Sequence, residues 1–257
     1  MDVRPLALLI PLCLACSSPS RAPAPPPPEP ATASPIVEPP PPVDARPPAL
    51  EGEWVQRVDD FYIGVPIGAR EPREIVVGVH GAGDRADWSC SEWVATLEGR
   101  TWVVCPIGHP AQWKDTFSWW SAEHIAKKAD AAVAALKAKY PAYVKDGPMF
   151  YAGWSQGATL ASEVFRARPG VYDRVALVEI GHTSLDARAV ASSLATNGAK
   201  HAIVACSTLK CRAFAADFAR AAKSAKLPTD VVDAGLRGHW FDDPMFQAIR
   251  PVAVPLL

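Results

Sequence analysis

From Glu51 onward, short runs of β-branched and other apolar residues alternate with longer alanine-rich stretches. This alternation favours βαβ units, in which a helix returns the chain to the start of the next parallel strand. We therefore expect one α/β domain over residues 51–257, with a mainly parallel sheet flanked by helices on both faces. About 200 residues are enough for one hydrophobic core.

The expected strands are short apolar runs at residues 61–65, 74–79, 102–105, 149–152, 174–179, 202–206 and 229–233. The expected helices lie between them, at residues 89–97, 121–140, 156–168, 186–195, 210–225 and 244–249. Pro141 and Pro169 end two of these helices, because a proline ring clashes with the preceding helical turn. No segment between the strands is long enough for a large lid domain.

The N-terminal residues have the pattern of a targeting segment. Arg4 precedes an apolar run that ends at Cys16 and is too short to cross a bilayer as a helix of about 20 residues. We expect residues 1–16 to be a signal peptide. Leu12-Cys13-Leu14-Ala15-Cys16 resembles a bacterial lipobox, in which a lipid is attached to the last cysteine, although Cys13 stands where that pattern prefers leucine. The alternative is a plain secretory signal in which Cys16 is incidental.

A proline-rich segment follows. More than half of the 27 prolines lie between Pro19 and Pro48, so residues 17–50 are expected to form a disordered, extended tether. A lipid on Cys16 would make the protein an exported bacterial lipoprotein at the periplasmic or outer cell surface, with the anchor as its only membrane contact. Without the lipid, we expect a secreted protein.

The charge balance and the cysteines indicate which partners and which cross-links the protein is expected to have. The 26 basic residues nearly balance the 27 acidic residues, which excludes nucleic acid as an expected partner, because phosphate binding needs clustered positive charge. Four cysteines remain after the leader, and an exported protein is expected to join them in two disulfides. Of the three connectivities we favour Cys90 with Cys105 and Cys206 with Cys211, since each pair links a strand end to a neighbouring helix or loop. After the leader, the sequence contains neither a Cys-x-x-Cys nor a His-x-x-x-His pattern, which are typical of metal sites.

The pentapeptide Gly153-Trp154-Ser155-Gln156-Gly157 follows an apolar run and opens an alanine-rich stretch. In such a strand-to-helix turn the serine adopts strained backbone angles, and the glycines leave room for neighbouring strands. The hydroxyl then stands at the carboxyl end of the sheet, beside a helix N-terminus that stabilises negative charge. Ser155 is therefore the candidate nucleophile. The alternative is a glycine-rich turn in which Ser155 only caps the helix.

Two further motifs follow other strands. His80-Gly81-Ala82-Gly83-Asp84 comes directly after residues 74–79. Small residues there let a backbone N–H approach a substrate oxygen, so Ala82 and Gln156 are the candidate oxyanion-hole donors. Gly238-His239-Trp240 follows the last expected strand. The general base for the serine is expected in the loop after that strand. His239 is the candidate base.

These three motifs together resemble the α/β-hydrolase superfamily, in particular its phospholipase/carboxylesterase and dienelactone-hydrolase groups. The segment from Cys105 to Trp120, with Phe117-Ser118-Trp119-Trp120, is similar to an aromatic segment of those groups. The resemblance covers residues 51–257. It implies hydrolysis of carboxylic esters or thioesters through an acyl-enzyme, with Ser155 as nucleophile and His239 as base, and it implies no cofactor.

One loop departs from the family pattern. The family carries its acid after the strand that corresponds to residues 202–206, whereas Cys206-Ser207-Thr208-Leu209-Lys210-Cys211 has no carboxylate. The base still needs an acceptor for its second ring N–H, because that partner fixes the tautomer and stabilises the imidazolium. Glu179, which ends the preceding strand, is the expected substitute, and Asp186 and Asp233 are the alternatives.

Tryptophans crowd the segments expected at the carboxyl edge of the sheet. Trp154 and Trp240 adjoin the candidate nucleophile and base, so we expect them to contact substrate, with Trp119 and Trp120 as further wall residues. Large rings suit an apolar, aromatic or sugar-containing group. Because no lid domain is expected, a small or accessible ester is favoured over a buried long-chain triglyceride.

Two functions of different classes fit the sequence. The first is an exported serine esterase that acts on a small-molecule ester. The second is a catalytically idle hydrolase-fold protein that serves as a binding module at the cell surface. The missing aspartate and the proline-rich tether motivate the second hypothesis.

Overall fold

The computed structural model describes residues 46–181 and 184–257. The predicted signal peptide, Cys16 and most of the predicted tether lie outside these residues. Leu50, which was expected to belong to the tether, is buried in the core. Its N–H donates to the carbonyl oxygen of Ala69 at 3.0 Å, and its own carbonyl accepts from Gly68 at 2.8 Å. The packed part of the chain therefore begins before residue 51.

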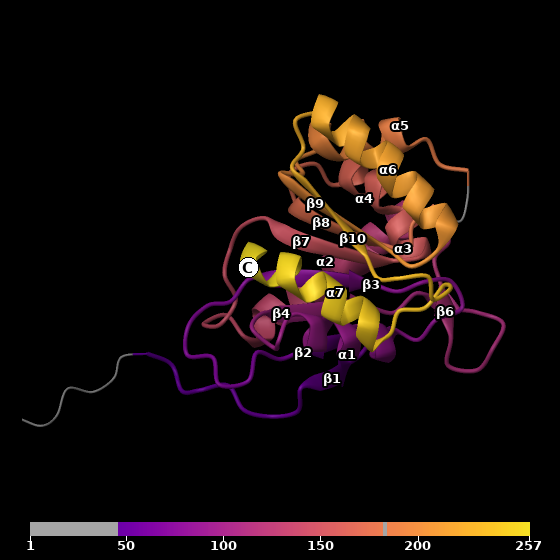
Figure 1. Cartoon of the computed structure of the whole chain (residues 1–257). Helices are drawn as coiled ribbons and strands as arrows, with labels where there is room; N and C mark the ends of the chain where they lie inside the picture. Colours follow the sequence, from indigo (N-terminus) through magenta and orange to yellow (C-terminus); the bar gives the residue numbers. More distant parts are fainter. Residues whose placement is uncertain (1–45, 182–183) are drawn as a thin grey trace, which may run out of the picture. The chain divides into compact units, whose positions relative to one another are not determined.

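Eight strands form the main sheet, in the spatial order β1-β2-β4-β3-β7-β8-β9-β10 (Figure 1). Neighbouring strands are parallel except β2, which is antiparallel to β1 and to β4. The strands are β1 Val55–Val58, β2 Phe61–Gly64, β3 Ile75–Val79, β4 Trp102–Pro106, β7 Met149–Trp154, β8 Tyr172–Val178, β9 His201–Cys206 and β10 Thr229–Asp233. Strand β1 was not expected from the sequence, because a four-residue strand with Gln56 and Arg57 at its centre has little apolar signal.

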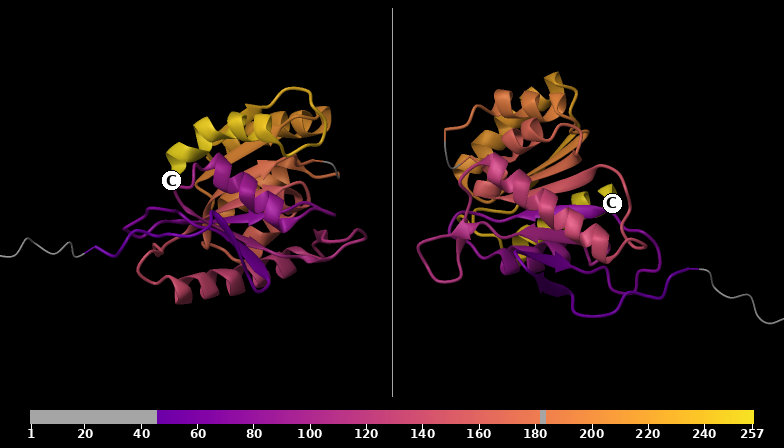
Figure 2. Two further views of the ribbon diagram at one scale, coloured as in Figure 1. Left: turned by 90° about the horizontal axis from the view of Figure 1, so that it is seen from below. Right: turned by 180° about the vertical axis from the view of Figure 1, so that it is seen from behind.

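Helices cover both faces of the sheet. Helices α2, α4, α5 and α6 pack on one face, and α1 and α7 pack on the other; Figure 2 shows α2 and α7 on opposite sides of the strands. The helices are α1 Ala86–Thr96, α2 Ala122–Lys139, α3 Gln156–Thr159, α4 Ala161–Ala167, α5 Ala187–Thr196, α6 Leu209–Ser224 and α7 Asp243–Ala253, followed by a 3-10 turn at Val254–Leu256. The single helix expected at residues 156–168 is divided into α3 and α4 at Leu160.

The two faces of the sheet build two layers of core. In β3, Val77 belongs to the layer under α2, α4, α5 and α6, whereas Val76 belongs to the layer under α1 and α7. In β7, Tyr151 belongs to the same layer as Val77, and Phe150 belongs to the same layer as Val76. Successive side chains of a strand point to opposite faces, so a strand covered on both sides is apolar throughout. This explains why the expected strands are continuous apolar runs.

The longest connection between the core elements runs from residue 107 to residue 121 and contains a small hairpin of β5 His109–Pro110 and β6 Phe117–Ser118. No lid domain is inserted within the described ranges. Likewise, none of the helices in residues 46–181 and 184–257 combines the length and apolarity that a membrane span requires.

The parallel strands bring their carboxyl ends to one edge of the sheet. His80 follows β3, Ser155 follows β7, Glu179 follows β8 and Ser207 follows β9, while the loop of residues 234–242 follows β10. Segments that are far apart in the sequence therefore meet at this edge, which is where ligands bind in open α/β sheets.

Candidate active site

Ser155 lies in a sharp turn between β7 and α3. Its φ of 50° and ψ of −107° are strained for a residue that has a side chain. A Cβ on Gly153 would lie 2.7 Å from the backbone nitrogen of Ala158, and a Cβ on Gly157 would lie 2.4 Å from the carbonyl oxygen of Val79. The two glycines therefore let the turn pack against its own helix and against β3, and this packing holds Ser155 in its strained conformation.

His239 lies beside Ser155, in the loop between β10 and α7. Its Nε2 is 2.9 Å from the Oγ of Ser155. Its ring stacks on the indole of Trp154, with ring centroids 4.5 Å apart. Gly238 has a φ of 87°, which glycine adopts without strain and which turns the chain just before the ring. This nitrogen–oxygen contact is the geometry in which an imidazole takes the proton of a serine hydroxyl.

Glu179 follows β8, and its side chain is fully buried. Its Oε2 is 3.4 Å from the Nδ1 of His239, which makes a long hydrogen bond. Burial alone would raise the pKa of Glu179, but the hydrogen bonds from His239 and from the loop after β9 outweigh burial and hold the pKa at about 2. Glu179 is therefore an ionised acceptor at neutral pH, aligned with the second nitrogen of the candidate base.

The loop after β9 donates hydrogen bonds to Glu179 instead of carrying an acid of its own. The backbone N–H groups of Ser207 and Thr208 donate to Oε1, and the hydroxyl of Thr208 donates to Oε2 at 2.8 Å. The Oγ of Ser207 lies 2.9 Å from Oε1 and 2.6 Å from the carbonyl oxygen of Gly238, so it links the carboxylate to the loop of the candidate base. The absence of an aspartate from this loop was visible in the sequence, but the supporting role of Ser207 and Thr208 was not.

Two disulfides join the same cysteines that were paired from the sequence. Cys90 on α1 is joined to Cys105 on β4, and Cys206 is joined to Cys211 at the start of α6. The second disulfide closes the loop that donates to Glu179. It therefore fixes the donors of this loop close to the carboxylate.

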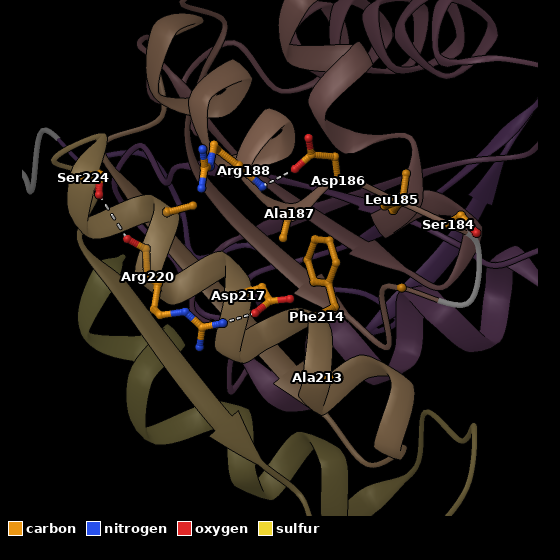
Figure 3. A pocket seen from close by; sticks show the side chains of 12 residues that line it. Ser184, Leu185, Asp186, Ala187, Arg188, Ala213, Phe214, Asp217, Arg220 and Ser224 are labelled. Carbon is orange, nitrogen blue, oxygen red and sulfur yellow. Dashed lines mark hydrogen bonds and ion pairs between the residues drawn. The ribbon is translucent and has the colours of Figure 1, made fainter.

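The alternative acids lie elsewhere. Asp186 lines a separate groove of about 1070 Å³ between α5 and α6, where its carboxylate caps α5 by accepting from the N–H of Arg188 at 2.8 Å (Figure 3). Asp233 forms an ion pair with Arg212. Within the described residues neither carboxylate contacts His239, so Glu179 is the acid that the fold brings to this ring.

The turn after β3 has one backbone donor that it does not use itself. The N–H of Gly81 donates to the Oδ2 of Asp84 at 3.4 Å, and the N–H of Gly83 donates to the Oγ of Ser118 at 2.9 Å. The N–H of Ala82, between them, has no acceptor among the residues that the structure describes. This unused donor is what an oxyanion site requires.

The turn runs against the candidate nucleophile. A Cβ on Gly81 would lie 3.1 Å from the Cβ of Ser155. Gln156 begins α3, and its backbone N–H also lacks an acceptor in the described ranges. The side chain of Gln156 instead binds the backbone of Trp119, because Oε1 accepts from the N–H of Trp119 at 2.9 Å and Nε2 donates to its carbonyl oxygen at 3.0 Å. Two unused backbone donors, of Ala82 and Gln156, thus belong to the segments that flank Ser155.

His80 supports this turn as a buried neutral histidine. The N–H of Gly108 donates to its Nε2 at 3.2 Å, so the ring proton is on Nδ1, which lies 2.7 Å from the carbonyl oxygen of Gly81. Burial lowers the pKa of His80 to about 4. The indole of Trp119 stacks on the ring at 4.6 Å and donates to the backbone carbonyl of His80 at 3.0 Å.

The four tryptophans predicted to contact substrate divide into two pairs. Trp154 and Trp240 line a pocket of about 300 Å³ beside Ser155. Trp119 is buried beneath the turn after β3 and is 3% exposed, so it supports the turn and does not line this pocket. Trp120 is 74% exposed but stacks on His109 outside the pocket. The expectation that Trp119 and Trp120 line the pocket is therefore wrong for both residues, because the sequence alone does not show where their rings point.

Several residues that line the pocket were not assigned to the site from the sequence, and four of them have aromatic or acidic side chains. They are two aromatic residues and two acidic residues: Trp88, Phe241, Asp84 and Glu92. Trp88 and Glu92 are four positions apart on α1, which places them on one helix face. That spacing was visible in the sequence, but the approach of α1 to the loop before α7 is a tertiary contact.

Neither a protein-family model nor a curated protein sequence matches the chain. Solved structures are similar to it at low sequence identity. An uncharacterised protein from Bacillus cereus ATCC 10987 is 12% identical over 72% of this chain, with a TM-score of 0.57, and the chain spans only 59% of that protein's length. A ferulic acid esterase is 11% identical, with a TM-score of 0.56, and the match covers 76% of this chain and 90% of the esterase.

A third similar structure is FphF, a fluorophosphonate-binding serine hydrolase from Staphylococcus aureus. It is 11% identical, with a TM-score of 0.52, and the match covers 76% of this chain and 91% of FphF. At these identities the similarity shows the fold. The chain has the α/β-hydrolase fold, which confirms the fold class expected from the sequence.

Proposed function

We propose that this chain with an α/β-hydrolase fold is a serine hydrolase that cleaves carboxylic ester or thioester bonds through an acyl-enzyme. In this proposal Ser155 is the nucleophile, His239 is the general base and acid, and Glu179 orients the base. The backbone N–H groups of Ala82 and Gln156 bind the oxyanion.

The reaction begins when the Oγ of Ser155 attacks the carbonyl carbon and its proton passes to the Nε2 of His239. The negative charge that forms on the carbonyl oxygen is stabilised by the two backbone donors. The tetrahedral intermediate then collapses, and His239 gives the proton to the leaving alcohol or thiol. A water molecule next attacks the acyl-enzyme, again losing its proton to His239, and the acid leaves as the Ser155 hydroxyl is restored.

One observation carries this proposal: the ring of His239 links Ser155 to Glu179. Its Nε2 lies 2.9 Å from the Oγ of Ser155, and its Nδ1 lies 3.4 Å from the Oε2 of Glu179. The three residues come from three separate loops at one sheet edge. A glycine-rich turn whose serine only capped a helix would not need this alignment, and Ser155 in fact makes no side-chain cap to α3.

Labelling with a fluorophosphonate tests the nucleophile directly. We expect the whole protein to be labelled on Ser155 and to hydrolyse a short 4-nitrophenyl ester, and Ser155→Ala should lose both properties. Ser224→Ala removes the hydroxyl of an exposed serine at the end of α6 and is the matched control; it should keep both. Absence of labelling in the folded protein would refute the proposal and favour the idle binding module.

The described residues also bear on the size of the substrate. Because residues 46–181 and 184–257 contain no lid domain over the pocket of about 300 Å³, a short or accessible acyl ester fits better than a long buried chain. A series of 4-nitrophenyl esters of increasing acyl length, assayed at equal concentration, tests this: kcat/KM should be highest for short acyl groups. A steady rise with chain length would contradict it.

We further propose that the protein is exported and that Cys16 carries a lipid. The supporting features are the short apolar leader, the lipobox-like residues and the proline-rich segment that follows. In a bacterial host, radiolabelled palmitate should be incorporated into the wild-type protein but not into Cys16→Ser. In detergent phase partitioning, the wild type should enter the detergent phase and the variant should stay in the aqueous phase. Equal partitioning and no label in both proteins would favour the plain secretory signal.

A further inference from the structure

The pocket beside Ser155 has an acidic and aromatic lining that the proposed mechanism does not use. Asp84, after β3, and Glu92, on α1, place two carboxyl groups in its wall, and no lysine or arginine lines it within the described residues. The carboxylate of Glu92 has no hydrogen-bond or ion-pair partner within residues 46–181 and 184–257. A carboxylate in such a position is available to a ligand.

The basic side chains near the pocket are already paired. Arg85 contacts the carboxylate of Asp87 at 2.5 Å and 3.0 Å, and Arg237 lies 2.9 Å from Asp242. Burial raises the pKa of Glu92 to about 7, and the negative charges of the nearby carboxylates at the start of α7 add to this effect. A ligand cation beside Glu92 would offset both effects, so the pocket is electrostatically matched to a positive group.

The aromatic residues add a second reason to expect a cation. Trp88 and Trp240 are 59% and 66% exposed, so their rings are accessible at the pocket. Trp154 and Phe241 stack at a centroid distance of 5.2 Å and form the wall nearest to the candidate base. The guanidinium of Arg85 lies over the ring of Trp88 at 4.6 Å from its centroid, so among the described residues the exposed ring of Trp240 is the one that offers its faces to a ligand. Aromatic faces combined with carboxylates are the surroundings in which ammonium groups are bound by cation–π contact.

Building on the proposed function, we propose that this pocket makes the enzyme selective for esters that carry an ammonium group in the part of the substrate that occupies it. Glu92 and the ring of Trp240 bind the cation while Ser155 attacks the neighbouring carbonyl. An ester with a carboxylate in the same part of the substrate is repelled by Glu92 and Asp84.

Matched esters measure the charge preference alone. Acetylthiocholine and 3,3-dimethylbutyl thioacetate have the same shape, but only the first has a positive nitrogen in place of a carbon. The 4-nitrophenyl esters of 4-(trimethylammonio)butanoic acid and 5,5-dimethylhexanoic acid form the same pair on the acyl side. At pH 8 we expect kcat/KM to favour the cationic member of at least one pair by about tenfold, and the pair that responds identifies the side of the ester that enters the pocket.

Glu92→Gln keeps the shape of the side chain and removes its charge. It should reduce the ratio of kcat/KM for the cationic ester to kcat/KM for its neutral partner by about tenfold, mainly by raising KM for the cationic ester. Glu163→Gln makes the same change on α4, at a half-exposed site outside the pocket, and is the matched control; it should keep the preference. An equal preference in Glu92→Gln and in the wild type would overturn the role of Glu92.

A binding measurement separates this inference from the proposed function. Ser155→Ala protein is titrated with choline and with 3,3-dimethylbutan-1-ol by calorimetry, and choline should bind at least about tenfold more tightly. If choline binds but no ester is hydrolysed, the pocket inference stands and the proposed function fails. A different result would refute the cation inference and leave the proposed function standing. In that result the neutral esters are hydrolysed, the cationic member of neither pair is favoured, and choline does not bind more tightly than 3,3-dimethylbutan-1-ol.

Discussion

Replacing Glu179 with Gln tests the most unusual feature of the site, an acid placed one strand earlier than the family pattern predicts. The pKa of Glu179 falls from an ordinary 4.5 to about 2 in the fold. Because the folded pKa is the lower one, the ionised carboxylate stabilises the fold above about pH 4.5, and this contribution is lost as the pH falls towards 2. The difference corresponds to about 3 kcal/mol of unfolding free energy at neutral pH.

Urea unfolding of the whole protein at a series of pH values measures this contribution. Glu179→Gln should lower the unfolding free energy by about 3 kcal/mol at pH 7, and the two proteins should converge towards pH 2 as the wild-type carboxylate is protonated. The variant should also lose about a thousandfold to ten-thousandfold in kcat, because His239 loses the charge that stabilises its imidazolium.

Asp186→Asn is the matched control, because it changes another carboxylate that accepts backbone N–H groups at the start of a helix. It should change the unfolding free energy by less than about 1 kcal/mol, because asparagine caps a helix about as well as aspartate, and it should leave kcat unchanged. A kcat for Glu179→Gln within a few fold of the wild type would refute the assignment of the acid. A stability difference that does not shrink at low pH would refute the electrostatic account.

Two further variants test the supports of the site. Gly157→Ala should cost about 3 kcal/mol in urea unfolding, because its Cβ would lie 2.4 Å from the carbonyl oxygen of Val79, whereas Gly170→Ala, with a φ of 76° but no atom within 4 Å, should cost about 1 kcal/mol; equal costs would contradict the packing argument. Burial lowers the pKa of His80 from 6.5 to about 4, so the unfolded chain binds a proton first, and stability that is present above pH 6.5 is lost as the pH falls towards 4. His80→Gln should remove about 3 kcal/mol of this pH dependence, and an unchanged slope of unfolding free energy against pH would show that another group titrates.

Features that depend on contiguous residues were accessible from the sequence. The strand, the serine turn and the following helix lie next to one another in the chain, so Gly153 to Gly157 indicated both the fold and the candidate nucleophile. His239 follows the last strand in the sequence. It was expected near Ser155, because the loops that follow parallel strands lie at the same edge of the sheet. The position of Glu179 was inferred in the same way, although its role as an acid is a prediction that the kinetic experiment must test.

Features that depend on how distant segments pack were decided only by the tertiary structure. Trp119 and Trp120 are neighbours with nearly identical sequence surroundings, yet one is buried on His80 and the other is exposed, since the side chain of Gln156 holds the backbone of Trp119. The acidic side of the pocket forms because α1 brings Glu92 towards the start of α7.

The sequence by itself determined the alternation of strands and helices, because local spacing of apolar residues encodes it. It also determined the sharp turn at Ser155, because backbone strain at a single serine requires small residues beside it. The tertiary structure decided the donors to Glu179, the burial of Trp119 and the charge of the pocket. These properties arise from distances between residues that are far apart in the chain, and such distances exist only once the sheet and its helices have packed.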